Sequence, residues 1–106
     1  MNNTVTIILA ELRRRFEVLY GERLGQMMLF GSQARGDAEP GSDIDVLVVL
    51  RGKVSSCEEI DRTIKDVADL SLHHNEVVSC VFVSEEQFQQ ERSPLMLNVR
   101  REGVPV

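Results

Sequence analysis

The segment from Asp43 to Leu50 constrains the fold of this chain more than any other. It reads DIDVLVVL, is rich in β-branched residues and is bounded by Gly41 and Gly52, which is the pattern of a β-strand. Its acidic start gives way to the apolar run 46–50, which is far too short to span a bilayer. A sheet with this segment as its clearest strand is therefore expected.

Two shorter apolar segments predict two more strands. Gln26 to Phe30 reads QMMLF and ends at Gly31, and Val77 to Val83 reads VVSCVFV. Strands mixed with helices on 106 residues predict one small domain, residues 1–106, of α/β (α+β) class. We expect a short mixed three-stranded sheet packed against helices that cover mostly one side.

Helical periodicity predicts two long helices. Apolar residues recur from a capping threonine, Thr4 or Thr6, until Gly21, which suits a helix C-cap. A second helix covers about 56–73. Its expected apolar stripe consists of Ile60, Ile64, Val67, Ala68 and Leu72.

The C-terminal segment predicts two short helices. A capping-box pattern of Ser84 and Gln87 opens a helix over about 85–91, and Pro94 can begin another that ends before Gly103. The apolar residues of SPLMLNVRREGVPV either form an interface or close the open face of the sheet. Both alternatives stay open at the level of sequence.

Asp43 and Asp45 are the first candidate site residues. They are two positions apart on a predicted strand, so both side chains leave the same face. Two carboxylates so close raise a pKa unless a cation lies between them, and hard oxygen ligands suit Mg²⁺, which also binds substrate phosphates. The pair therefore predicts a metal site that takes phosphates.

Gly31, Ser32 and Arg35 form a candidate phosphate-binding turn, with ten residues between Ser32 and Asp43. The turn joins a strand to a short helix, whose first N–H groups are unpaired and whose dipole favours an anion. Gly31 lets a phosphate come close and Ser32 can donate a hydroxyl. Arg35 adds positive charge for the same phosphates or for the acidic loop that follows.

Each of these features has an ordinary structural explanation when it is taken alone. An Asp-x-Asp pair is usually a solvated strand end, a Gly-Ser pair is usually a turn, and a surface ion pair is worth little. The combination at this spacing arises by chance in such a chain with a probability on the order of one in a thousand. The combination is therefore interpreted as a site.

The segment GSQARGDAEPGSDIDVLVV, residues 31–49, resembles the signature of the minimal nucleotidyltransferases, a branch of the DNA polymerase beta superfamily. The predicted order of helices, strands and loops agrees with that family along the whole chain. The resemblance implies a small polymerase-beta-like fold in which Gly31 and Ser32 hold the triphosphate of ATP. It also implies that Asp43 and Asp45 bind two Mg²⁺ ions for in-line attack on the α-phosphorus, which releases pyrophosphate.

The resemblance also implies a partner. Members of this family are often encoded beside a HEPN-domain protein, and several pairs resemble toxin and antitoxin. In such pairs the nucleotidyltransferase neutralises a HEPN ribonuclease by transferring AMP to it. An antitoxin role, with AMP transferred to a hydroxyl of a HEPN partner, is therefore what the resemblance implies for this chain.

One position departs from the family pattern. Active members usually carry a third carboxylate on the next strand, and alignment of VVSCVFVSEE places that position on Ser79, which cannot serve as a carboxylate. Glu76 lies three residues away, on the opposite face of a regular strand. Two functions therefore stay open: a protein adenylyltransferase, or a weak or inactive module that neutralises its partner by contact. A regulatory nucleotide sensor cannot be separated from them by sequence.

Composition narrows the classes of function. The formal charge of −5, from 12 basic and 17 acidic residues, argues against nonspecific nucleic-acid binding. The N terminus lacks the order of a signal peptide, so a cytoplasmic location is expected. A domain of this size has modest stability, so homo- or hetero-oligomerisation is a further expectation.

The remaining chemistry-bearing residues are given structural roles. Cys57 and Cys80 are expected to be buried or half-buried thiols, because no metal or disulfide spacing is present. His73 and His74 are expected to be exposed near a helix end. The methionines, in particular Met27, Met28 and Met96, are expected in the core or an interface.

Overall fold

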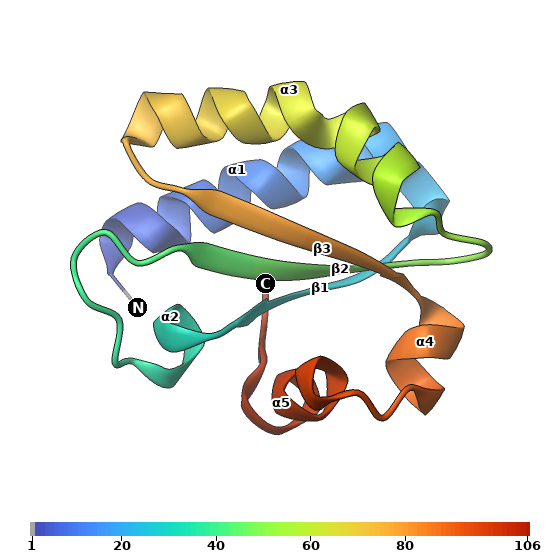
Figure 1. The fold of residues 1–106 in the computed structure, drawn as a ribbon. Coiled ribbons are helices and arrows are strands. Elements are labelled where there is room, and N and C mark those ends of the chain that lie inside the picture. Colours follow the sequence, from blue (N-terminus) through green and yellow to red (C-terminus); the bar gives the residue numbers. More distant parts are fainter. Residues whose placement is uncertain (1) are drawn as a thin grey trace.

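The computed structural model describes residues 2–106 (Figure 1). Helices and strands alternate along most of the chain, and a short 3-10 turn, Gly21–Arg23, joins the first helix to the first strand. The elements are α1 (Asn3–Tyr20), β1 (Leu24–Phe30), α2 (Ser32–Arg35), β2 (Ile44–Leu50), α3 (Ser56–His74), β3 (Val78–Ser84), α4 (Glu85–Gln90), α5 (Pro94–Glu102) and β4 (Val104–Pro105). The mixed α/β class is confirmed.

The sheet has four strands in the order β3-β2-β1-β4, so the expectation of three strands was wrong by one. β2 is antiparallel to β1 and parallel to β3, and β4 is antiparallel to β1. β4 contributes only two residues, Val104 opposite Leu29 and Pro105 opposite Met28. Such a short strand with a proline has no alternation that a sequence reading could detect.

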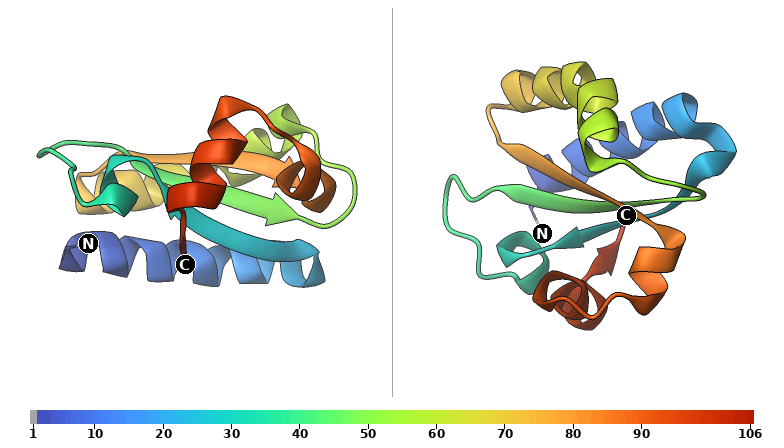
Figure 2. Two further views of the ribbon diagram at one scale, coloured as in Figure 1. Left: turned by 90° about the horizontal axis from the view of Figure 1, so that it is seen from below. Right: turned by 45° about the vertical axis from the view of Figure 1, so that its right-hand side comes forward.

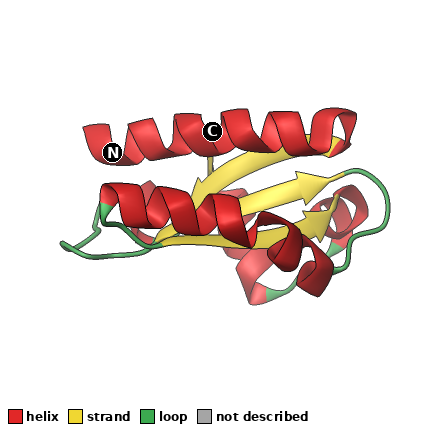
Figure 3. Ribbon diagram, turned by 90° about the horizontal axis from the view of Figure 1, so that it is seen from above, coloured by secondary structure: helices red, strands yellow, loops and turns green. Residues whose placement is uncertain are grey.

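Helices cover both faces of the sheet, which corrects the expectation of one covered face. α1 and α3 lie on one face, and α4 and α5 lie on the other (Figures 2 and 3). β2 alternates between these layers: Ile44 and Val46 pack with the α1 and α3 side, and Leu47 and Val49 pack with the α5 side. Because both faces are buried, the second half of β2 is apolar at every position.

The C-terminal segment closes the second face of the sheet. Met96 and Val99 of α5 are fully buried and pack with Leu47, Val49 and Val83. The inward side of α5 therefore closes the open face of the sheet, which was one of the two alternatives left open by the sequence. Its outward residues Leu95 and Leu97 stay partly exposed. Met27 and Met96 are core residues, as expected.

Most of the apolar stripe expected on α3 was wrong, and of its five residues only Val67 packs against the core. Ile60, Ile64 and Leu72 are 46%, 59% and 82% exposed, whereas Glu59 and Thr63 are only 2% exposed. α3 is therefore rotated so that a charged residue faces the interior. Hydrogen bonds and ion pairs offset the free-energy cost of burying the Glu59 carboxylate, because a buried charge needs partners.

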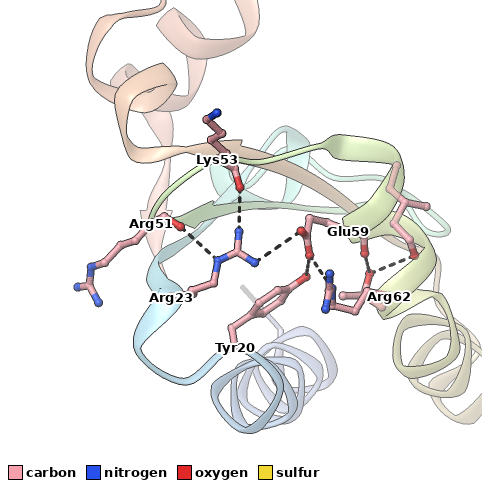
Figure 4. Close-up of polar contacts among 8 residues, drawn as sticks. Tyr20, Arg23, Arg51, Lys53, Glu59 and Arg62 are labelled. Atoms are coloured by element: carbon pink, nitrogen blue, oxygen red, sulfur yellow. Dashed lines mark hydrogen bonds and ion pairs between the residues drawn. The ribbon is translucent and has the colours of Figure 1, made fainter.

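Glu59 is held by residues from three elements (Figure 4). The Tyr20 hydroxyl donates to Glu59 Oε1 at 2.7 Å, and Arg62 Nε donates to the same oxygen at 3.1 Å. Arg23 Nη1 lies 3.7 Å from Glu59 Oε2, and Arg23 also donates to the backbone oxygens of Arg51 and Lys53. Burial and the hydrogen bond to Glu59 raise the pKa of Tyr20. This network fastens α1 to α3 near the carboxyl end of β2.

Several local expectations are also corrected. α1 begins earlier than predicted, since Asn2 caps it by accepting a hydrogen bond from the Val5 N–H at 2.8 Å. Cys57 is exposed rather than buried, and Cys80 is half-buried as expected. His73 is exposed as expected, but His74 is half-buried, with Nε2 3.7 Å from a Glu11 oxygen. None of the helices formed by residues 2–106 has the length and apolar character needed to cross a membrane.

Candidate functional site

The two aspartates lie at the amino end of β2. Asp43 immediately precedes the strand and is exposed, whereas Asp45 is half-buried within it. Asp45 lies on the same face of β2 as Leu47 and Val49, which pack with α5, so its side chain is on the α5 side of the sheet. Asp43 lies outside β2, so the expectation that both carboxylates leave one face of a strand stays a prediction.

Gly31 forms the turn between β1 and α2, directly against Asp45. Its backbone adopts φ +75° and ψ −157°, a region that is nearly restricted to glycine. A Cβ atom at this position would lie 2.5 Å from Asp45 Oδ2. The Asp45 carboxylate therefore lies very close to Gly31, and the approach of a phosphate that the sequence predicts at this glycine stays a prediction. Gly31 keeps the space in which this carboxylate sits.

Ser32 is half-buried and begins α2, the single helical turn that follows Gly31. Its backbone oxygen accepts hydrogen bonds from the N–H groups of Gly36 and Asp37 at 3.0 and 3.2 Å. The Gly31 oxygen similarly accepts from the N–H group of Arg35 at 3.1 Å. These bonds close the turn and fix the start of the loop that leads to Asp43.

Arg35 is held between two carboxylates. Its Nε donates to Asp37 Oδ2 at 3.3 Å, as one of the two sequence alternatives expected. Its Nη1 donates to Glu102 Oε1 at 3.2 Å, a contact that sequence reasoning missed because 67 positions separate the residues. The hydrogen bond to Asp37 and the negative charge of Asp37 raise the pKa of Arg35, and the contact with Glu102 raises it further.

The pKa of Asp45 depends on burial and on two neighbouring charges. Burial raises the pKa of Asp45 first, the charge of Asp43 raises it further, and the charge of Arg35 acts in the opposite direction. A cation beside the pair would favour the ionised form of both carboxylates. Because the charge of Arg35 lowers the pKa of Asp45, the two side chains belong to the same candidate site.

The donor set fits Mg²⁺ bound together with phosphates. Asp43 and Asp45 offer hard carboxylate oxygens, and residues 2–106 contain no cluster of three His, Cys, Asp or Glu side chains that could hold a metal alone. Mg²⁺ in phosphate-handling proteins commonly takes one or two carboxylates and completes its six ligands with phosphate oxygens and water. Two carboxylates without a third therefore suit an ion that arrives with a nucleotide.

Ser79 lies beside Asp45 on the neighbouring strand. The parallel register pairs Asp45 with Ser79, so a side chain at this position shares the face of the aspartate. Glu76 does not replace it, because this residue precedes β3 and lines a separate cavity of about 430 Å³ with Gln33 and Pro40. Neither aspartate lines that cavity. The position expected to carry a third carboxylate is thus a serine in the folded chain.

The sheet order, the Gly-Ser turn after β1 and the acidic start of β2 define a nucleotidyltransferase fold. Residues 8–98 match the family model described as "Nucleotidyltransferase domain". The chain belongs to this nucleotidyltransferase family. Its resemblance to the minimal nucleotidyltransferases is confirmed.

Two curated relatives come from Methanocaldococcus jannaschii, and both are named "putative protein adenylyltransferase". One is 31% identical over 72 residues, which cover 68% of this chain and 72% of the relative. The other is 38% identical over 72 residues, which cover 68% of this chain and 66% of the relative. Both relatives therefore extend beyond the matched segment.

Solved structures share the fold at low sequence identity. A crystal structure described as a toxin-antitoxin with AMP-PNP is 19% identical, with a TM-score of 0.63, and the match covers 98% of this chain and 72% of that one. A mutant of the toxin-antitoxin MntA-HpeT is 18% identical, also with a TM-score of 0.63, and the match covers 99% and 72%. These likenesses establish the arrangement of helices and strands.

Proposed function

We propose that this protein binds Mg²⁺-ATP and transfers AMP to a hydroxyl group of a partner protein. The observation that carries the proposal is the packing of Asp45 against Gly31, which joins the acidic start of β2 to the phosphate-binding turn within one family-typical segment. The names of the two archaeal relatives support adenylyl transfer to protein. Recognition of ATP by this chain is part of the proposal.

In this proposal each site residue has a separate task. Asp43 and Asp45 hold Mg²⁺, which in such sites neutralises charge on the phosphates and on the leaving pyrophosphate. Ser32 and the backbone at Gly31 contact the triphosphate. Arg35 supplies a guanidinium whose Nη2 is not used by Asp37 or Glu102, so it can donate to a phosphate oxygen.

The proposed reaction is a substitution at the α-phosphorus. The acceptor oxygen forms a bond to this phosphorus, the bond to the oxygen that bridges to the β-phosphorus breaks, and pyrophosphate leaves with its electron pair. The acceptor proton passes to water, because Ser79 offers no carboxylate beside Asp45. The chain therefore contributes mainly positioning and charge, which account for most catalysis in phosphoryl transfer.

The proposed partner is a HEPN-domain toxin. The sequence resemblance implies such a partner, and two structures that share this fold are described as toxin-antitoxin complexes, one of them with a nucleotide analogue. The exposed outer residues of α3, Ile60, Ile64 and Leu72, show that apolar surface is available on the chain. A neighbouring gene that encodes a HEPN protein would support the pairing.

A second candidate function is neutralisation of the partner by contact, with weak or absent catalysis. The observation in its favour is the serine paired with Asp45 in the parallel register. Removal of a metal-binding carboxylate lowers the affinity of a site for its ion and can leave nucleotide binding without turnover. The two functions share the fold and differ in whether AMP is transferred.

Binding of Mg²⁺-ATP is the first step of the proposed adenylyl transfer, and a binding experiment tests it. Calorimetric titration with a nonhydrolysable ATP analogue is performed with Mg²⁺ and with EDTA. We expect saturable binding that needs Mg²⁺ and is lost in a variant with Asp43→Ala and Asp45→Ala. Asp61→Asn, a neutralised exposed aspartate on α3, serves as the matched control and should bind as the wild type does. Equal binding by the double variant would refute the assigned site.

A further inference from the structure

The last residue of α5 belongs to the neighbourhood of the nucleotide site. Glu102 is far from Arg35 in sequence, yet its Oε1 lies 3.2 Å from Arg35 Nη1, and its side chain is only 20% exposed. α5 approaches α2 because the chain turns at Gly103 into β4, which pairs with β1 just before the Gly31 turn (Figures 1 and 2). The sheet therefore brings the C-terminal segment to the phosphate-binding turn.

The position of Glu102 is fixed by its backbone. The Gly103 N–H donates to the Val99 oxygen at 2.7 Å, and a Cβ at Gly103 would lie 2.5 Å from that oxygen and 2.9 Å from Met28 Cε. This tight turn leaves little freedom for the end of α5. Met96 and Val99 anchor the same helix in the core. The carboxylate is thus presented from the closely packed end of α5.

Helix stability does not explain a carboxylate at this place. The carboxyl end of a helix has a partial negative charge, which disfavours an acidic residue in the last turn and favours a basic one. Arg100 and Arg101 follow that preference, and Glu102 departs from it. The favourable interaction of Glu102 is its ion pair with Arg35, so this carboxylate stabilises the position of a site residue and not the helix.

Two carboxylates orient the Arg35 guanidinium. Asp37 takes Nε and Glu102 takes Nη1, while the arginine side chain is still 45% exposed. An exposed arginine otherwise samples many rotamers, and fixing it upon ligand binding costs entropy. With two of its nitrogens held, Nη2 is presented in a defined direction. The charge of Arg35 already acts on Asp45 in this arrangement.

We propose that Glu102 is a positioning residue that holds Arg35 ready for the phosphates of the nucleotide, and thereby joins the C-terminal helix to the active site. This inference rests on the proposed binding of Mg²⁺-ATP. Glu102 acts through Arg35 and does not itself touch the nucleotide or the metal. Its removal therefore weakens binding only while Arg35 is present.

A double-mutant cycle tests the inference. The dissociation constant for the Mg²⁺-bound ATP analogue is measured for the wild type, Glu102→Gln, Arg35→Ala and the double variant. We expect Glu102→Gln to raise the dissociation constant about two- to fivefold, because a half-exposed ion pair contributes only modestly. In the Arg35→Ala background the same change has no further effect. Glu102→Asp, which keeps the charge, restores part of the affinity.

Controls separate positioning from loss of folding. Glu22→Gln makes the same chemical change at an exposed residue of the 3-10 turn and should leave both affinity and melting temperature unchanged. Unchanged or tighter binding by Glu102→Gln, or an equal loss with and without Arg35, overturns the positioning role while leaving the proposed function intact. A wild type that does not bind the nucleotide at all overturns the proposed function, and the role of Glu102 with it.

Discussion

Replacement of Gly31 by alanine probes the contact on which the site is built. The new methyl group meets two separate penalties. The backbone at φ +75° and ψ −157° is nearly restricted to glycine, and the Cβ would lie 2.5 Å from Asp45 Oδ2. Since Asp45 is half-buried on a central strand, its carboxylate can give way only by rotating out of its present position.

The expected destabilisation is about 2–6 kcal/mol. A residue forced into such a backbone region costs on the order of 1–3 kcal/mol, and overpacking beside the carboxylate adds about 1–3 kcal/mol. For a domain of this size each kcal/mol lowers the melting temperature by roughly 4–8 °C. The total stability of such a domain is about 5–15 kcal/mol, so the loss is a large fraction of it and the variant should melt well below the wild type.

Gly36→Ala is the matched control. Gly36 also has a positive φ, +82°, but it adopts the left-handed helical region, and nothing lies within 4 Å of its added Cβ. Its substitution should cost roughly 1–2 kcal/mol from the backbone alone. The excess cost at Gly31 therefore combines its more restricted backbone region with the contact with Asp45, and the double variant with Asp45→Ala separates the two.

Urea unfolding followed by circular dichroism gives the free energies of unfolding. We expect Gly31→Ala to lose clearly more stability than Gly36→Ala, and Asp45→Ala to recover on the order of 1–3 kcal/mol of that loss when the two are combined. Equal losses at Gly31 and Gly36, with additive effects of Gly31→Ala and Asp45→Ala, would refute the close packing of the turn against the carboxylate.

Three further predictions follow from other contacts. Folding raises the pKa of Asp45, so ionisation of this carboxyl lowers the stability of the fold as the pH rises above 3.8, the ordinary pKa of an aspartate. Asp45→Asn should therefore raise the melting temperature of the metal-free protein near pH 7, and this gain should shrink toward pH 4. A gain that does not depend on pH would contradict this. Tyr20→Phe removes one hydrogen bond to the buried Glu59 and should cost about 1–3 kcal/mol in urea unfolding without changing nucleotide affinity; a loss below about 0.5 kcal/mol would show that the bond is unimportant. Ser79→Asp places a third carboxylate beside Asp45, so it should lower the melting temperature in EDTA and strengthen binding of Mg²⁺ with nucleotide, and calorimetry showing unchanged affinity would count against that position as a metal ligand.

Strands β1, β2 and β3 and the sequence positions of the candidate site residues could be predicted from the sequence because their signals are local. β2 is marked by β-branched residues and flanking glycines, and the turn and the aspartates are marked by their spacing. Alignment with the family pattern placed Ser79 at the position of the third carboxylate, and the structure pairs this residue with Asp45. Local periodicity thus specified the central part of the fold.

The features that were missed depend on contacts between distant segments. α3 turns Glu59 inward because Tyr20 and Arg23, which belong to other elements, satisfy its carboxylate. Apolar periodicity alone favoured Ile60 and Ile64 for that face. Glu102 joins Arg35 only once β4 has paired with β1, and two residues of strand leave no pattern to detect.

The most direct test of adenylyl transfer is the intact mass of the partner. The purified protein is incubated with ATP, Mg²⁺ and the product of its neighbouring gene, and the variant with Asp43→Ala and Asp45→Ala is treated identically. We predict that the partner gains the mass of one or more AMP groups with the wild type and none with the variant. A stable complex without any mass gain would contradict AMP transfer and would favour neutralisation by contact, with Ser79 as its structural reason.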